Sequence, residues 1–211
     1  MEPATLEAAA PSGGAGRRVG EGRMDGLSYA EQGSTDRPFP EPMTGGWPED
    51  YRVAVGAYPL EAGDPAVAFE ALAEGILTWG LHRGAGLRVD TTAPRALPGA
   101  EVSTALGVGP LRLPAPSTVL WSREVLRDGS GQPVPGQRAG FGYGTRKGHP
   151  VRGEEGFYAE LTPDGKLIFR VSAYSVPASA FYRLGAPALR LVQRYVTARY
   201  VRAARRLALG G

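Results

Sequence analysis

Six short runs of alternating or continuous apolar residues, separated by turn residues, fill the sequence between Leu87 and Ser175. A side-chain period of two is the mark of β-strands, and short turns between such runs favour antiparallel neighbours. The segment TPDG between the last two runs is a short hairpin signal. We therefore expect a meander of antiparallel strands at 87–91, 100–108, 117–126, 137–145, 153–161 and 166–175.

One strand and one helix are expected before this meander. Residues 51–59 alternate around two valines and end at a proline, which predicts a strand. Asp64 can cap a helix that has Pro65 in its first position, and helical apolar spacing continues until Gly84.

A long amphipathic helix is expected from Ala178 onward. Apolar residues recur there at intervals of three and four, with arginines on the other arc; they are Leu189, Val192, Val196, Tyr200, Ala203 and Leu207. Strand, helix, six strands and long helix is the element order of the helix-grip fold. We thus predict an α+β fold in which a curved antiparallel sheet of about seven strands grips the C-terminal helix. The apolar stripe would pack on the concave face, over either a solid core or a ligand cavity.

The chain of 211 residues is long enough for one hydrophobic core. Residues 1–26 are small, polar and charged, and are predicted to be a disordered extension. A single domain is expected over 27–207. Its first part, 27–51, is rich in turn residues and should be ordered but irregular, with four apolar residues as anchors onto a surface: Leu27, Tyr29, Phe39 and Trp47.

The absence of cysteine excludes disulfides, thiolate metal sites and cysteine nucleophiles. No run of about 18 apolar residues and no apolar signal segment is present, so a soluble, cytoplasmic protein is expected. The two histidines, His82 and His149, are far apart in the sequence, and no H-E-x-x-H motif occurs. We therefore expect no metal site and no cofactor.

The stretch GFGYGTRKGHPVRGEEGF, residues 140–157, carries the densest chemistry. Its glycine spacing, G-x-G-x-G inside an expected strand, matches neither the dinucleotide fingerprint nor the P-loop. With a period of two, the three glycines share one strand face, while Phe141 and Tyr143 share the other. Something should approach the bare face closely, namely the last helix, the region of Trp79 or a ligand.

Glu154 and Glu155 are neighbours on an expected strand and should point to opposite faces. The inward one needs a partner such as Arg170, Tyr143 or His149. It is then either a hydrogen-bonded anchor or a base or ligand-binding carboxylate with a shifted pKa, whereas the other glutamate is expected to be an outward charge.

Both histidines have an ordinary structural explanation beside a functional one. The sequence Gly148, His149, Pro150 predicts a rigid turn that positions an imidazole. His82 and Arg83 lie in the expected last turn of a helix, where cations suit the helix dipole.

The C-terminal segment 183–211 contains seven arginines and no acidic residue. Such a run is either a solvated helix face or a contact for an anionic surface. The residues in question are Arg190, Arg194, Arg199, Arg202 and Arg206. No specific nucleic acid is predicted as a partner.

Five segments together resemble the domain of unknown function 1990 family, also called uncharacterised protein family 0548. They are LTWGLHRGAGLRV at 77–89, GVGPLRLPAPSTVLW at 107–121, FGYGTRKGHPVRGEEGF at 141–157, SAYSVPA at 172–178 and RLGAPALRLVQRYVTARYVRA at 183–203. Where such proteins commonly have Leu-Pro, this chain has Arg146 and Lys147, which makes the loop more basic. The resemblance implies a small, mostly bacterial domain with no established reaction.

Three functional hypotheses follow. The first is a non-catalytic binder of an apolar or amphipathic small molecule between the sheet and the last helix. Its candidate contacts are Trp79, His82, Arg83, Tyr143, Thr145, His149, Glu154, Glu155 and Arg170. The second is an enzyme that uses His149 with Glu154 or Glu155 as an acid/base pair. The third is association with a membrane surface or nucleic acid through the C-terminal arginines.

Overall fold

The computed structural model describes residues 23–107, 113–179 and 186–210, with side chains in the last range described from Leu191 onward. Of the expected N-terminal extension, residues 1–22 lie outside the described part of the chain. The elements are β1 (Arg52–Leu60), α1 (Pro65–Leu77), α2 (Gly80–Gly84), β2 (Arg88–Asp90), β3 (Glu101–Leu106), β4 (Leu113–Arg123), β5 (Gln137–Thr145), β6 (Val151–Leu161), β7 (Leu167–Pro177) and α4 (Ala186–Leu209).

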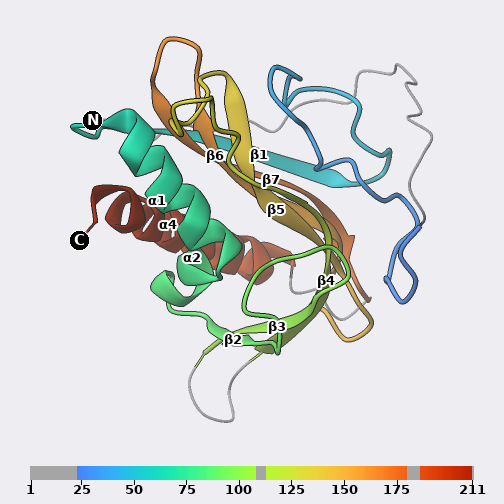
Figure 1. Cartoon of the computed structure of the whole chain (residues 1–211). Coiled ribbons are helices and arrows are strands. Elements are labelled where there is room, and N and C mark those ends of the chain that lie inside the picture. The colour runs from blue at the N-terminus through green and yellow to red at the C-terminus, as the bar shows by residue number, and fades with distance from the viewer. Residues whose placement is uncertain (1–22, 108–112, 180–185, 211) are drawn as a thin grey trace.

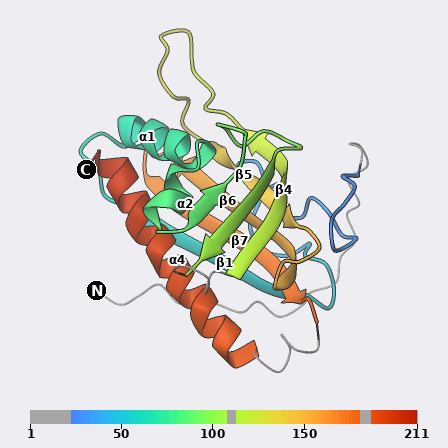
Figure 2. The same ribbon diagram turned by 90° about the horizontal axis from the view of Figure 1, so that it is seen from below.

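The strands form one antiparallel sheet in the order β1-β7-β6-β5-β4-β3-β2. Strands β2 to β7 pair with their sequence neighbours, and β1 closes the other edge by pairing with β7, from Arg52 opposite Ser175 to Leu60 opposite Leu167. The sheet curves, and α4 crosses its concave side (Figures 1 and 2). The predicted seven-stranded helix-grip architecture is confirmed.

The predicted first helix is divided at Trp79, which has a positive φ of 68°. Left-handed backbone is unfavourable for a bulky residue, so burial must offset it. The Trp79 ring is fully buried and its indole N–H donates to the Ala93 carbonyl at 3.0 Å. The spacing of apolar residues did not predict this break, because it depends on burial of the Trp79 side chain. That burial is a tertiary effect, and it overrides the local backbone preference.

The main core lies between the concave sheet face and the helices. Phe141, Phe157 and Phe169 of the sheet are fully buried there, as are Leu72 and Ile76 of α1. Each such side chain contributes about 1.5–3 kcal/mol by leaving water. The C-terminal half of α4 contributes to the same core through Tyr200, Ala203 and Ala204.

Helix α4 differs along its length. In its C-terminal half, Tyr200, Ala203 and Ala204 are buried, and a Cβ at Gly84 of α2 would lie 3.2 Å from the Ala203 Cβ. In its N-terminal half, Leu191 is 67% exposed and the side chain of Val192, from the expected stripe, is 42% exposed. Val192 and Val196 of the expected stripe face the sheet across a cavity instead of a solid core, and Leu189 lies outside the described side chains.

Residues 27–51 cover the convex face, on the side opposite to the helices (blue in Figure 1). A β-bulge between Val119 and Trp121 turns the Trp121 ring to this face, where it stacks on Tyr158 with ring centroids 4.8 Å apart. The indole N–H of Trp121 donates to the Thr35 hydroxyl at 3.0 Å. Because Tyr29 is buried as well, the expected anchoring of this irregular segment is confirmed for that residue.

Candidate functional site

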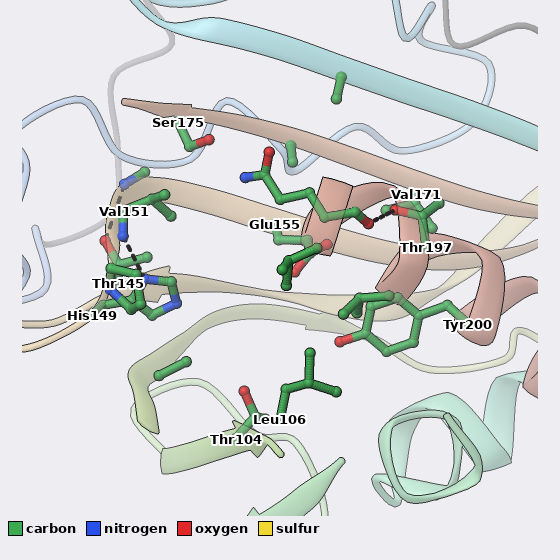
Figure 3. A pocket seen from close by; sticks show the side chains of 18 of the residues that line it. Thr104, Leu106, Thr145, His149, Val151, Glu155, Val171, Ser175, Thr197 and Tyr200 are labelled. Atoms are coloured by element: carbon green, nitrogen blue, oxygen red, sulfur yellow. Dashed lines mark hydrogen bonds between the residues drawn. The ribbon is translucent and has the colours of Figure 1, made fainter. Parts of the chain in front are cut away.

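A cavity of about 430 Å³ lies between the concave face of the sheet and the N-terminal half of α4. Residues of β1, β3, β4, β5, β6, β7 and α4 line it. In Figure 3, Thr145 and His149 lie at one end, Tyr200 at the other, and Glu155 between them. The cavity has room because small residues face it from the edge strand β1 and its neighbour β7: Ala54 and Gly56 of β1, and Ala173 and Ser175 of β7.

Glu155 is the carboxylate of this cavity. It stands opposite Tyr143 in the β5–β6 register, and the Tyr143 hydroxyl donates to Glu155 Oε2 at 3.0 Å. Burial raises the pKa of Glu155 to about 7, against the opposing effect of that hydrogen bond. The hydroxyl of Tyr200 interacts with that of Tyr143, and burial holds the pKa of both tyrosines well above the usual range. The carboxyl can therefore change its protonation state near neutral pH while the tyrosines remain neutral.

His149 borders the same cavity in the turn between β5 and β6. Its backbone N–H donates to the Arg146 carbonyl at 3.1 Å, and Gly148 has a φ of 97°. The predicted turn is confirmed. The Val151 backbone N–H donates to Nδ1 at 3.1 Å, and burial lowers the pKa of His149 to about 4. The ring is therefore neutral near pH 7, and since Nδ1 accepts, Nε2 carries the proton.

Thr145 connects the cavity wall to the N-terminal segment. Its hydroxyl accepts from the Gly153 backbone N–H at 3.0 Å and shares a hydrogen bond of 2.8 Å with the Ser28 hydroxyl.

Glu154 touches the cavity wall, but its carboxylate lies on the convex face, as strand alternation requires. It is 2% exposed and accepts hydrogen bonds from the Tyr29 hydroxyl at 2.9 Å, the Gly33 N–H at 2.6 Å and both donors of Thr35. Burial raises its pKa, and these donors oppose the rise. The two glutamates do point to opposite faces, but the expected outward charge is wrong, because residues 27–51 bury that face.

The bare face of the glycine run is also the convex one. A Cβ at Gly142 would clash with the Trp121 indole, and one at Gly144 would clash with the Tyr29 hydroxyl. The expectation that the last helix, the Trp79 region or a ligand covers this face is wrong. The sequence could not show it, because the bulge that turns Trp121 depends on strand pairing.

Four candidates lie away from the cavity. Trp79 and His82 are fully buried in the core, where the His82 ring packs against Phe157 and Tyr200 at centroid distances of 4.8 and 5.2 Å. Burial lowers the pKa of His82 to about 3. Arg83 donates to the Thr78 carbonyl at 2.9 Å from the surface end of α2.

Arg170, the last of the four, is on the convex face. Its guanidinium donates to both carboxylate oxygens of Glu160, at 2.7 and 2.9 Å. Glu160 also pairs with Arg138, which makes this a structural ion network.

The sequence reasoning expected a cavity against the last helix but did not name the residues of α4, β1 and β7 that line it. Gln193, Val196 and Thr197 line the cavity, and so does Tyr200, which was interpreted as a packing residue. A usable signal was present in the alternate small residues of β1 and β7, which leave a sheet face without bulk.

The C-terminal arginines have mixed environments. Arg199 donates to the Ala85 carbonyl and, at 2.7 Å, to the Tyr195 hydroxyl, while Arg206 donates to the Gly84 carbonyl at 2.6 Å. These two satisfy the end of α2. Arg194 and Arg202 are exposed, whereas the side chain of Arg190 lies outside the described part. Contact with an anionic surface stays a prediction.

Within the described ranges, no helix combines the length and apolar character needed to cross a membrane. In the same part of the chain, no group of three or more His, Cys, Asp and Glu side chains is arranged to hold a metal ion.

A curved antiparallel sheet around a C-terminal helix, with a cavity between them, defines a helix-grip protein. The chain belongs to the family described as Domain of unknown function (DUF1990), whose model matches residues 28–203. The resemblance read from the five sequence segments is confirmed.

Two curated relatives carry the description UPF0548 protein. One, from Deinococcus radiodurans, is 42% identical over 65 residues, covering 31% of this chain and 33% of the relative. The other, from Arabidopsis thaliana, is 38% identical over 56 residues, covering 26% and 27%. The matched part thus spans about a third or less of each relative's length.

Among solved structures, norcoclaurine synthase from Thalictrum flavum in complex with dopamine and hydroxybenzaldehyde is similar, with 10% identity and a TM-score of 0.46 over 89% of this chain and 94% of that chain. A Deinococcus radiodurans protein is similar with 14% identity and a TM-score of 0.43, over 75% and 98%. Dopamine and hydroxybenzaldehyde are ligands of norcoclaurine synthase, and similarity of fold alone does not assign them to this chain.

Proposed function

We propose that this protein binds an apolar or amphipathic small molecule in the cavity between the sheet and α4. The observation that supports this function is a space of about 430 Å³ with mostly apolar walls and a few converging polar groups. Small-molecule sites typically have volumes of about 300–1,000 Å³ and this kind of lining.

The polar groups suit a ligand with an apolar body and at least one polar end. Glu155 and Tyr143 form one polar point of the wall, and the Nε2–H of His149 is available at another. Val171, Val196 and Leu106 supply apolar surface between them.

Acid/base catalysis by His149 with Glu154 or Glu155 remains the alternative, and of these two glutamates Glu155 is the one whose carboxylate shares the cavity with His149. The Glu154 carboxylate is on the convex face. Within the described residues, His149 and Glu155 both line the cavity but make no direct hydrogen bond. The His149 side chain accepts a hydrogen bond from the Val151 backbone. Val151 precedes Glu155 by four residues, which is about 13 Å along a strand. This separation favours binding over direct proton exchange between the two.

Binding is tested with protein purified gently and examined by native mass spectrometry, and with titration of the neutral fluorophore N-phenyl-1-naphthylamine. We expect a co-purifying molecule or saturable fluorophore binding near one equivalent. Ala173→Phe should abolish it, because a ring at this position projects into the cavity. Ala198→Phe is the matched control, since Ala198 is exposed on the outer side of α4.

Empty spectra together with no saturable binding would refute the function. Equal loss in both variants would place binding outside the cavity.

A further inference from the structure

We propose that the cavity selects an apolar molecule carrying a protonated amine, with the Glu155 carboxylate as its counter-ion and the Tyr143 and Tyr200 rings beside it. This inference rests on the proposed function, since it requires that the cavity binds a small molecule.

The carboxylate of Glu155 is available to a ligand. Among the described residues, two acidic residues border the cavity, Glu154 and Glu155. Both carboxylate oxygens of Glu154 already accept hydrogen bonds, from Tyr29, Gly33 and Thr35. Glu155 receives its hydrogen bond from Tyr143 on Oε2, and no described residue donates to Oε1. A carboxylate accepts about four hydrogen bonds. An ammonium group, with up to three N–H donors, fits this deficit.

No cation of the described chain pairs with Glu155. Arg52 and Arg194 border the cavity with side chains exposed to solvent, and Arg52 donates to the Gln193 side chain at 3.0 Å. His149 is neutral near pH 7. An ionised carboxylate in apolar surroundings is unfavourable until a proton or an opposite charge neutralises it. Because the described chain provides no such cation, we infer that the ligand provides the positive charge.

The aromatic groups around Glu155 favour a cation as well. Tyr143, Tyr200 and Tyr58 all line the cavity. The negative faces of such rings attract ammonium groups, by about 0.5–2 kcal/mol as solvent is excluded. A ligand carboxylate would instead meet the like charge of Glu155, which disfavours its binding.

Amine binding should depend on pH through Glu155. The titratable groups that face it are Tyr143 of β5, Tyr200 of α4, Tyr58 of β1 and His149 of the β5–β6 turn. The tyrosine pKa values are raised and that of His149 is about 4, so none of these four changes charge between pH 5.5 and 8. Arg52, Arg194 and Glu154 also border the cavity. Burial raises the pKa of the Glu154 carboxyl, which lies on the convex face, so Glu155→Gln separates its effect from that of Glu155. The residues that β3, β4 and β7 contribute to the lining are not titratable.

An ammonium ion favours ionised Glu155, whose pKa is about 7 without it. Amine affinity should therefore rise with pH, by up to about tenfold per unit below pH 7, and proton release should accompany binding at pH 6. A neutral ligand should show no such rise.

Three probes with one skeleton test the proposal by isothermal titration calorimetry: 2-(1-naphthyl)ethylamine, 2-(1-naphthyl)ethanol and 3-(1-naphthyl)propanoic acid. At pH 7.5 the amine should bind about tenfold or more tighter than the alcohol, and the acid weakest. Between pH 7.5 and 6 the amine alone should lose about tenfold, with proton release seen as a buffer-dependent enthalpy. Glu155→Gln should remove the preference and spare alcohol binding, while exposed Glu61→Gln should change neither.

The wild-type pH comparison needs no variant, so misfolding of Glu155→Gln cannot obscure the result. If the alcohol binds but the amine is not preferred, or the acid binds best, the amine proposal is wrong and the proposed function stands. If none of the three binds although N-phenyl-1-naphthylamine does, the amine proposal is wrong and the proposed function stands; if that fluorophore does not bind either and the native spectra are empty, both fail.

Discussion

Glu154 and Glu155 show how far one position changes the role of a side chain. Alternation along β6 sends Glu154 to the convex face, where Tyr29, Gly33 and Thr35 donate four hydrogen bonds to it. Glu155 faces the cavity, where Tyr143 is its one hydrogen-bond donor among the residues that the structure describes. Glu154 therefore fastens the N-terminal segment, while Glu155 keeps capacity for a ligand.

Glu155→Gln should stabilise the ligand-free protein at high pH. The folded-state pKa of about 7 exceeds the ordinary 4.5, so the folded state binds more protons between these values and stability falls as pH rises through them. The variant should match the wild type near pH 4.5 and exceed it by about 1–3 kcal/mol at pH 8. Urea denaturation at both pH values measures this, and a pH-independent difference would contradict it.

His82→Phe should remove an acid sensitivity. His82 is fully buried, neither ring nitrogen has a partner among the described residues, and its pKa is about 3 instead of 6.5. The unfolded state takes up a proton below pH 6.5, so the wild type loses stability as pH falls. Relative to the wild type, the variant should gain about 2 kcal/mol between pH 7.5 and 5. His149 titrates in both proteins, so its contribution cancels when the two unfolding free energies are subtracted. The same pH dependence of stability in the wild type and the variant would refute the argument.

Strand β5 carries different kinds of residue on its two faces. Its aromatic side builds the core and the cavity wall through Phe141 and Tyr143, while its glycine side admits Trp121 and Tyr29. The glycines are needed for close packing on the convex face, not for a phosphate or a ligand.

Gly142→Ala should destabilise the protein although alanine is a small residue. The added Cβ would clash with the Trp121 indole, which is held by Tyr158 stacking and by Thr35. We expect a loss of about 2 kcal/mol, measured by chemical denaturation. Gly129→Ala is the control, because no heavy atom lies within 4 Å of its Cβ position, and its effect should stay within about 0.5 kcal/mol. Equal effects would disprove the close-packing role.

The arrangement of sheet and helices gives the two halves of α4 different packing. The C-terminal half of α4 packs on α1 and α2 (Figure 2). Its N-terminal half contributes Val192 and Val196 to the cavity, and Leu191 is exposed. Opening of the second half would give a ligand access without disturbing the core.

Hydrogen exchange should reveal this difference. Amides of residues 192–197 are expected to exchange about ten times faster or more than those of 200–208, since fewer buried contacts oppose local opening. Saturating 2-(1-naphthyl)ethanol should slow exchange at 192–197 selectively. Uniform protection along α4, with or without the probe, would contradict a local opening.

Alternation and helical spacing are enough to define the strands, the long C-terminal helix and the opposite orientation of Glu154 and Glu155, because these depend on local geometry. Tyr143, Thr145, His149 and Glu155 could be identified as candidates for the same reason. The break at Trp79, the bulge that turns Trp121 and the burial of Glu154 under residues 27–51 could not, since each arises from contacts between distant segments. The cavity beside Glu155 likewise depends on tertiary contacts. Small residues of β1 and β7 face the N-terminal half of α4 there, while the helix packs on the core through its C-terminal half.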